Sequence, residues 1–302
     1  MLEDTTQLNE FAKFHPVVNF AYFSSVILYS MVFMHPICLV ISLVCAFVYS
    51  TLIKGAKNVK FGIFYMLPMM IMSALINPAF NHEGATILTY FSSGNPLTLE
   101  SITYGVAAAV MLVTVILWFS CYNAVMTSDK FIYLFGKVIP AMSLILSMVL
   151  RFVPRFKAEL ANISYAQKCI GRDVSNGSVF ARFMHGIRIL SIMVTWAFEN
   201  AIQTADSMRC RGYGLPNRSA FSIYRFDSRD KKAIGVIAFS AICVFLGAAL
   251  GNAGFRYFPT MKSFGNIWTQ IVFFIAYFVL CATPIFIELH EEAKWKRLRS
   301  GI

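Results

Sequence analysis

Charged residues are scarce in this chain, and acids are scarcer than bases. Asp, Glu, Lys and Arg make up 14% of its 302 residues and apolar residues make up 58%, whereas soluble domains are roughly 25% charged. This composition excludes an ordinary soluble domain and predicts an integral membrane protein. The net charge of +11 is typical of the cytoplasmic loops of membrane proteins and does not require a nucleic-acid partner.

The sequence also lacks the motifs of common catalytic and metal sites. Its seven cysteines form no CxxC pair and lie mostly in apolar runs, so we interpret them as small apolar residues. There is no GxxxxGK[ST] phosphate-binding loop, no HExxH and no Ser/His/Asp order that supports catalysis. His82 and Glu83 are adjacent, but no further ligands flank them. These absences predict a protein that is not an enzyme and that holds neither metal nor cofactor.

Long apolar runs are present instead, and they predict the membrane spans. A span needs about 18 apolar residues, and in lipid it must be helical to satisfy its own backbone. Six runs qualify, at approximately 17–34, 36–53, 61–80, 103–125, 233–253 and 267–288. His35 and Pro36 leave room only for a tight turn between the first two runs. The sequence SGNP within 81–101 indicates a small hairpin or a surface loop.

Lysine and arginine alternate between the loops, and this alternation predicts the orientation. The loops at 35–36 and 80–102 contain no basic residue and the loop at 254–265 contains two. The loops that alternate with them contain more: three at 54–60, sixteen at 126–232 and four after 288. By the positive-inside rule, both termini and the segment 126–232 face the cytoplasm.

The segment between the fourth and fifth spans is too long and too apolar for a disordered linker. We expect three helices in it, from Asp129 to about Leu150, from about Arg151 through Pro154 to Ile170, and from about Ser178 to Cys210. The chain then divides into a membrane segment of about four helices at 1–125, a cytoplasmic helical domain at 126–232, and a membrane segment of about two helices at 233–302.

Two stretches of this domain leave the number of spans open. If 131–153 and 178–199 are counted, there are eight spans rather than six. Arg182 and Arg188 would then lie inside the second stretch, and an Arg in mid-membrane costs roughly 2.5–3.5 kcal/mol. Six spans are therefore preferred.

The last two of the expected cytoplasmic helices end in similar sequences. AQKCIG at 166–171 and SMRCRG at 207–212 both finish with the Gly that commonly follows a helix C-terminus. The cations near these ends are also favoured by the helix dipole, by about 0.3–1 kcal/mol each. A functional interpretation is that the ends insert into an acidic groove of a partner, because the planar fork of Arg holds carboxylates well.

Together with other segments, these ends make the chain similar to a known family. FHPVVNF at 14–20, VMTSDKFIYLFGKVIP at 125–140, LRFVPRFKAELANISYAQKCIG at 150–171 and ADSMRCRGYG at 205–214 occur in this order. They resemble the His-Pro segment, the Thr-Ser segment and the two Ala-Arg-Gly regions of the transmembrane T component of energy-coupling factor (ECF) transporters, the CbiQ-like family. The resemblance covers roughly residues 14–290.

The resemblance implies an all-α integral membrane protein of the prokaryotic plasma membrane, with about six transmembrane helices and a cytoplasmic coupling domain between the fourth and fifth. It implies a non-catalytic subunit of an ATP-driven ECF-type ABC importer for vitamins or transition-metal ions. The implied partners are two ABC-type ATPase subunits, which hydrolyse ATP, and a small membrane S component, which binds the substrate. Coupling helices would pass the motion of the ATPases to the S component.

The resemblance also implies a set of ATPase-docking residues, namely Lys168, Cys169, Ile170, Gly171, Arg209, Cys210, Arg211 and Gly212. Compared with the Ala-Arg-Gly motif of the family, the second end reads Cys210-Arg211-Gly212, with Cys in place of Ala. The first end reads Cys169-Ile170-Gly171, so Ile170 occupies the Arg position. Either Lys168 or Arg172 supplies the missing charge, or this dock is mainly apolar. We therefore expect unequal docks, with Arg211 as the ion-pairing contact.

Two other functions are compatible with parts of the sequence. A secondary transporter or channel would bind solute itself, but polar residues inside the spans are few: Asn19, Asn123 and Glu288. A membrane enzyme acting on anionic lipid headgroups would suit the basic segment electrostatically, but no catalytic constellation supports it.

Overall fold

The chain folds almost entirely into helices, which confirms the expected all-α membrane protein. The structure is a computed structural model that describes residues 10–90, 96–136, 139–175, 177–213, 215 and 224–300. It divides into two compact units, one made of Met1–Phe131 with Tyr224–Ile302 and the other of Ile132–Ile223. Among the described residues, five helices are long and apolar enough to cross a membrane.

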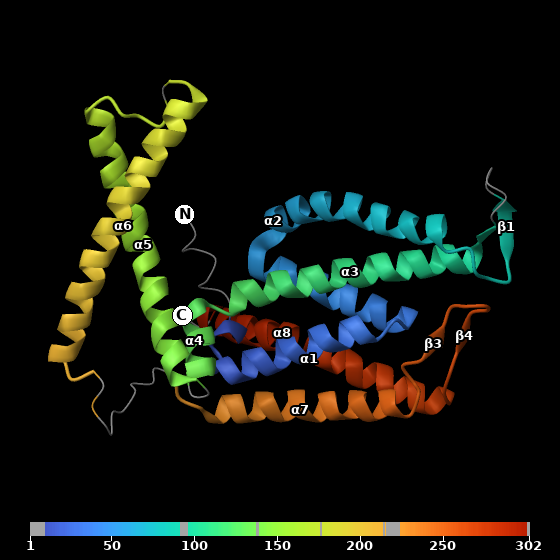
Figure 1. Cartoon of the computed structure of the whole chain (residues 1–302). Helices are drawn as coiled ribbons and strands as arrows, with labels where there is room; N and C mark the ends of the chain where they lie inside the picture. Colours follow the sequence, from blue (N-terminus) through green and yellow to red (C-terminus); the bar gives the residue numbers. More distant parts are fainter. Residues whose placement is uncertain are drawn as a thin grey trace. The chain divides into compact units, whose positions relative to one another are not determined.

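The first unit is a bundle of apolar helices (Figure 1). Its main helices are α1 (Pro16–Val32), α2 (Pro36–Phe80), α3 (Leu99–Val125), α7 (Ser228–Ala249) and α8 (Ile267–Ser300). Helix α2 packs along α3, α7 packs along α8, and α1 contacts both α3 and α7. Segments from the two ends of the chain therefore share one core.

Aromatic residues fill this core. Trp118, Tyr22, Tyr49 and Phe23 are fully buried, and the rings of Tyr22 and Trp118 meet edge to face at 6.0 Å. Their polar atoms are mostly satisfied, since Trp118 Nε1 donates to Ser42 Oγ at 2.9 Å. Buried aromatics with a satisfied polar atom stabilise a single packing of the helices.

A repeated His-Pro pair begins the first two helices. In both, the histidine is the N-cap and the proline is the first helical residue, where its missing N–H costs nothing. The His15 ring accepts a hydrogen bond from the N–H of Val17, and the His35 ring accepts one from the N–H of Ile37, both at 3.3 Å. The expected tight turn at His35 is confirmed.

Helix α2 contains a sharp bend that the sequence analysis interpreted as a loop between two spans. Gly55 has φ +75° and ψ 153° and breaks the helical geometry, in a backbone conformation that is essentially restricted to glycine. Figure 1 shows the chain turning sharply between the two parts of α2. The part before the bend is long enough to span a membrane, and the part at Met66–Phe80 is a shorter apolar helix.

Two small antiparallel hairpins accompany the helices. Strands β1 (Ile87–Tyr90) and β2 (Pro96–Thr98) pair with each other, as do β3 (Phe255–Arg256) and β4 (Lys262–Ser263). The first pair confirms the hairpin indicated within 81–101, although its turn at 91–95 lies outside the described residues.

The second unit consists mainly of two long helices, α5 (Pro140–Cys169) and α6 (Val179–Cys210). The expected helix break near Leu150 is wrong, because α5 runs without interruption through Arg151 and Pro154. The preceding short helix α4 (Ser128–Gly136) ends much earlier than expected. Pro140 explains the difference, since proline at the first position of a helix favours a start there.

The expected spans agree with the structure in part. Helices at 36–53, 103–125, 233–253 and 267–288 are long and apolar enough to cross a membrane, whereas 17–34 and 61–80 coincide with shorter apolar helices. Helix α6, which we expected in the cytoplasm, also satisfies the criteria of length and composition. Apolar residues dominate α6 from Val179 to Phe198, but Arg182 and Arg188 interrupt them, which is why its sequence fits both interpretations.

Candidate functional site

The candidate site is the pair of carboxyl ends of α5 and α6, where the sequence predicted partner contacts. Helix α5 ends at Cys169, with Ile170 as its C-cap and Gly171 following at φ +77°. The N–H of Gly171 donates to the carbonyl of Lys168 at 3.0 Å, and the N–H of Arg172 donates to the carbonyl of Gln167 at 2.9 Å. These two bonds define a Schellman motif, which the positive φ of glycine permits.

Helix α6 ends in the same way. Arg211 is its C-cap and Gly212 has φ +77°. The N–H of Gly212 donates to the carbonyl of Arg209 at 3.0 Å, and the N–H of Tyr213 donates to the carbonyl of Met208 at 3.1 Å. The two ends can therefore be matched position by position. The equivalent pairs are Lys168 with Arg209, Cys169 with Cys210, Ile170 with Arg211, and Gly171 with Gly212.

The two ends differ in charge. Lys168 Nζ forms an ion pair with Asp173 Oδ2 at 3.4 Å, across the turn that follows α5. Hydrogen bonds from the hydroxyl and the N–H of Ser175 lower the pKa of Asp173, with Lys168 adding to the effect. In the part of the chain that the structure describes, Arg209 and Arg211 form no ion pair. The end of α6 therefore presents positive charge that no ion pair among the described residues neutralises. At the end of α5, Asp173 neutralises the charge of Lys168.

Both ends are exposed on the second unit. The side chain of Ile170 is 59% exposed, and Cys169, Cys210 and Arg211 are also exposed. The side chains of both helix ends are therefore accessible to a partner. Over the described ranges, no group of three or more His, Cys, Asp or Glu side chains is placed to hold a metal ion.

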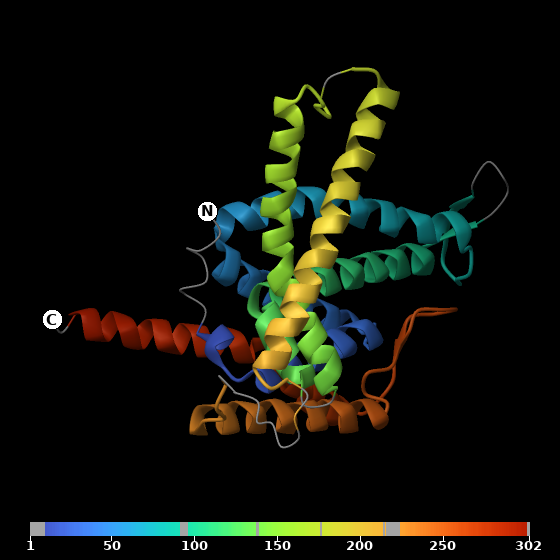
Figure 2. The same ribbon diagram turned by 60° about the vertical axis from the view of Figure 1, so that its left-hand side comes forward.

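The two ends lie at opposite ends of the helix pair. Figures 1 and 2 show α5 and α6 crossing and running in opposite directions. A helix of 32 residues, the length of α6, is about 48 Å long, so the two ends are separated by roughly that distance. The crossing is held by Trp196, whose ring meets the Phe156 ring edge to face at 5.5 Å and lies under the Arg155 guanidinium at 5.5 Å.

Asp173 is the residue that the sequence analysis missed at this site. The order Asp-Val-Ser at 173–175 is a signal for a local turn, because an Asp side chain can accept from the backbone two residues later. That the carboxylate also reaches back to Lys168 depends on the Schellman turn at Gly171, which the sequence does not reveal by itself.

A second group of residues links the N-terminal segment to α7 and α8 within the first unit. The short 3-10 helix η2 (Phe11–Lys13) precedes α1. Glu288 of α8 accepts from the N–H groups of Glu10 at 3.2 Å and Phe11 at 3.0 Å. Asp230 of α7 accepts from the N–H of His15 at 3.0 Å. Buried carboxylates that bind backbone N–H groups are strong local attachments.

Lys130 attaches the same segment to α4. Its ammonium group donates to the carbonyl of Ala12 and, at 3.0 Å, to the carbonyl of Val125. Burial lowers the pKa of Lys130 to about 8. Lys130 lies two residues before the start of the second unit, and Asp230 lies soon after its end. We name Glu288, Asp230 and Lys130 the N-terminal clamp.

Comparison with known proteins gives several relatives of one kind. Over 106 residues, the chain is 32% identical to the energy-coupling factor transporter transmembrane protein EcfT of Staphylococcus aureus, covering 35% of this chain and 40% of that protein. It is 28% identical over 191 residues to the EcfT 1 protein of Listeria monocytogenes, covering 59% of this chain and 68% of that protein. It is 31% identical over 103 residues to EcfT of Streptococcus equi, covering 34% of this chain and 38% of that protein.

The alignments therefore span about two fifths of two of these relatives and about two thirds of the third. No protein-family model matches the chain. The relatives nevertheless carry the same description in several bacteria, and the ordered motifs point to the same proteins. The resemblance of this multi-pass membrane protein to the transmembrane component of energy-coupling factor transporters is thereby confirmed.

Proposed function

We propose that this protein is the energy-coupling membrane subunit of an ECF-type ABC importer, docked on two ATPase subunits by the carboxyl ends of α5 and α6. The observation that carries the proposal is the matched pair of exposed helix ends, in a chain similar to EcfT proteins. The chain itself performs no catalysis in this account. ATP would be hydrolysed by the partner subunits.

The geometry of the second unit favours two partners over one. Ends separated by roughly 48 Å, one length of α6, are too far apart to enter one groove. An identical backbone cap at each end is suited to equivalent grooves on two copies of a similar subunit. Each ATPase would then hold one end, and a change in the distance between the ATPases would move α5 relative to α6.

The chemistry of the two docks is unequal. Arg211 would pair with a carboxylate of one ATPase, because its guanidinium is exposed and has no ion-pair partner among the described residues. Ile170 would fill an apolar part of the equivalent groove on the other ATPase. We assign the charge near the first dock to Arg172, since Lys168 is engaged by Asp173.

The N-terminal clamp provides a route from the coupling helices into the membrane bundle. Lys130 and Asp230 flank the two chain connections to the second unit, and both bind the segment at 12–15. Glu288 fixes the same segment to α8. Displacement of either connection would therefore be passed to α1 and α8, and from there to an S component that carries a vitamin or a transition-metal ion.

Co-purification tests the proposal. The full-length protein, expressed with candidate ATPase and S-component genes from the same organism, should yield a complex with two nucleotide-binding subunits and one small membrane protein. Substrate uptake in proteoliposomes should require ATP and all of these subunits. A secondary transporter, the alternative, would instead catalyse uptake when the chain is reconstituted alone, and this result would overturn the proposal.

A further inference from the structure

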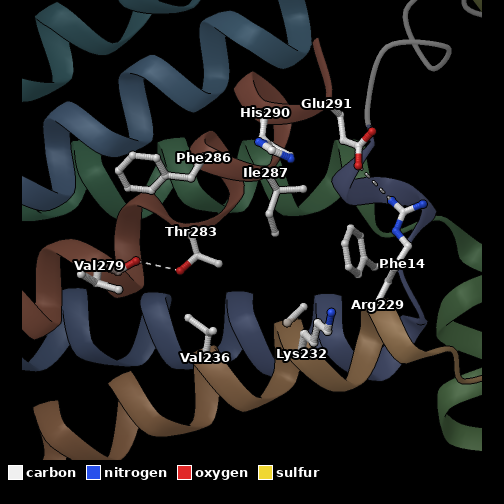
Figure 3. Close-up of a pocket in the computed structure, with 11 residues that line it drawn as sticks. Phe14, Arg229, Lys232, Val236, Val279, Thr283, Phe286, Ile287, His290 and Glu291 are labelled. Carbon is white, nitrogen blue, oxygen red and sulfur yellow. Dashed lines mark hydrogen bonds and ion pairs between the residues drawn. The ribbon is translucent and has the colours of Figure 1, made fainter. Parts of the chain in front are cut away.

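A pocket of about 600 Å³ opens between α7 and α8, within the first unit. Figure 3 shows Arg229 and Glu291 near one end of it, and Val279 and Phe286 near the other. Its volume lies within the range of about 300–1,000 Å³ that is typical of ligand sites. The residues of the docking site and of the N-terminal clamp do not line it, so its role is separate from theirs.

The pocket changes character along its length. Ala233, Val236, Val279 and Phe286 line an apolar part, and the polar part is lined by Arg229, Lys232, His290 and the acid Glu291. The spans predicted from the sequence end at 233 in α7 and at 288 in α8, so the expected boundary between hydrocarbon and headgroups crosses the pocket where its character changes. An apolar part in hydrocarbon and a cationic part at headgroup level match the two halves of a phospholipid.

The charge of the polar part favours an anion. Arg229 Nη2 lies 3.9 Å from Glu291 Oε1, and its guanidinium lies over the Phe14 ring at 5.4 Å, which orients it. Lys232 is exposed and forms no ion pair in the described part of the chain. The rim therefore has one cation beyond those that are neutralised locally. A zwitterionic headgroup would offer no net charge to match it.

We propose that this pocket binds an anionic diacyl phospholipid, with its phosphate at Arg229 and Lys232 and an acyl chain along Val236, Val279 and Phe286. The site lies on the side of the membrane where Lys and Arg are most abundant in the loops. The proposal rests on the position of α7 and α8 in a membrane and not on ATPase docking, so it can fail or hold independently of the proposed function.

Native mass spectrometry of the full-length protein tests this site. The protein in detergent is mixed with phosphatidylglycerol or with phosphatidylcholine of identical acyl chains. The detergent is then removed in the mass spectrometer, and the lipid that stays bound is measured. Wild-type protein should retain phosphatidylglycerol preferentially. The Arg229→Gln and Lys232→Gln substitutions should each reduce that preference on the order of fivefold, the effect expected of one juxtamembrane cation.

Lys231→Gln is the matched control, because Lys231 is exposed on the same turn of α7 but does not line the pocket. It should leave the preference unchanged. Equal losses for Lys231→Gln and Lys232→Gln, or equal retention of both lipids by the wild type, would overturn the proposal.

The apolar part needs a separate test. Val236→Trp should fill the acyl-chain path and reduce retention of phosphatidylglycerol, whereas Ile242→Trp, on an exposed part of α7 outside the pocket, should not. A photoreactive group at position 236, activated in native membranes, should attach to lipid. Attachment to a protein, or displacement of the lipid by soluble glycerol phosphate, would contradict a lipid site.

Discussion

Ile170 and Arg211 occupy the same position in two different helices. Each is the C-cap of a long helix, each is followed by a glycine at φ +77°, and each is enclosed by the same pair of backbone hydrogen bonds. The backbone therefore takes the same Schellman cap at both ends, with an apolar side chain at the C-cap of α5 and a cationic one at the C-cap of α6. This relationship makes the contribution of the arginine measurable, because the same chain supplies its own comparison.

The first prediction concerns these two side chains. Arg211→Ala should weaken binding of an ATPase subunit by tenfold or more, because a hydrogen bond to a charged group contributes about 1.5–3 kcal/mol. Ile170→Ala should have a smaller effect, since it removes only apolar contact. Binding of purified ATPase to the membrane subunit in nanodiscs measures both.

Arg188→Ala controls for the loss of one exposed cation from α6, away from its end, and should bind normally. Ile170→Arg should make the first dock resemble the second and strengthen it. Normal ATPase affinity in the Arg211→Ala variant would contradict the assigned role of this arginine.

The second prediction concerns the glycines. Gly171→Ala and Gly212→Ala should both destabilise the helix ends, by about 1–2 kcal/mol for an L-residue in the left-handed region. Neither Cβ meets a fixed obstacle, because a Cβ at Gly171 meets no atom within 4 Å and one at Gly212 would lie 3.1 Å from Cδ1 of the exposed Leu215, which can move aside. Hydrogen exchange in the last turns of α5 and α6 should therefore become faster by similar factors in the two variants. Gly212→Asn should exchange more slowly than Gly212→Ala, since Asn tolerates this conformation, and the reverse order would argue against backbone strain as the cause.

Much of the site was accessible from sequence because glycine stops and the cations beside them are local signals. Gly171 and Gly212 follow the ends of their helices as predicted. The residues at the two helix ends could therefore be identified from the sequence. The break before Pro140 was not predicted, because the apolar pattern of 131–150 continues across it without a change of period. The bend at Gly55, by contrast, lies within the loop that the lysines at 54–60 predicted between two spans.

Contacts between segments that are distant in the chain could not be predicted from the sequence. Glu288 is one of the few polar residues within the predicted spans, but its partners, the N–H groups of Glu10 and Phe11, lie 278 and 277 residues away. The hydrophobic periodicity of a sequence predicts helices and strands but does not predict which distant residues pair. The ion pair between Lys168 and Asp173 was hidden for a different reason, since it depends on the direction of the chain after the helix cap.

The third prediction concerns Glu288. Glu288→Gln should destabilise the protein by about 1–3 kcal/mol, because Oε1 and Oε2 each accept from one backbone N–H and the amide replaces one of these acceptors with an NH2 donor. In the proposed complex it should also reduce the amount of substrate imported per ATP hydrolysed, since the clamp would transmit less motion. Thermal unfolding and a combined uptake and ATPase assay measure the two effects. Glu292→Gln, on the same helix but paired only with Lys296 among the described residues, is the control and should behave as the wild type. Unchanged unfolding in the Glu288→Gln variant would argue against the clamp.

The fourth prediction concerns pH and Lys130. The native pKa of about 8 lies below the ordinary value of 10.5, so between these two values the unfolded chain binds more protons than the native chain. Unfolding free energy should therefore rise with pH across this window, relative to the Lys130→Met variant. Below about pH 8 the difference between wild type and variant should be constant. Thermal unfolding from pH 7 to 10 would reveal the trend, and a difference that falls as the pH rises would contradict the burial of this lysine.

The fifth prediction uses the native cysteines of the two helix ends and tests the central claim most directly. Cys169 and Cys210 are exposed, whereas Cys38, Cys45, Cys121 and Cys281 are buried and Cys243 is partly buried. A bulky maleimide should therefore label both tips of the isolated protein, and peptide mapping can quantify each separately. The proposed docking predicts that two bound ATPase subunits protect Cys169 and Cys210 together, while Arg211→Ala restores labelling of Cys210 first. Undiminished labelling of Cys210 in an intact complex with both ATPases would contradict the account.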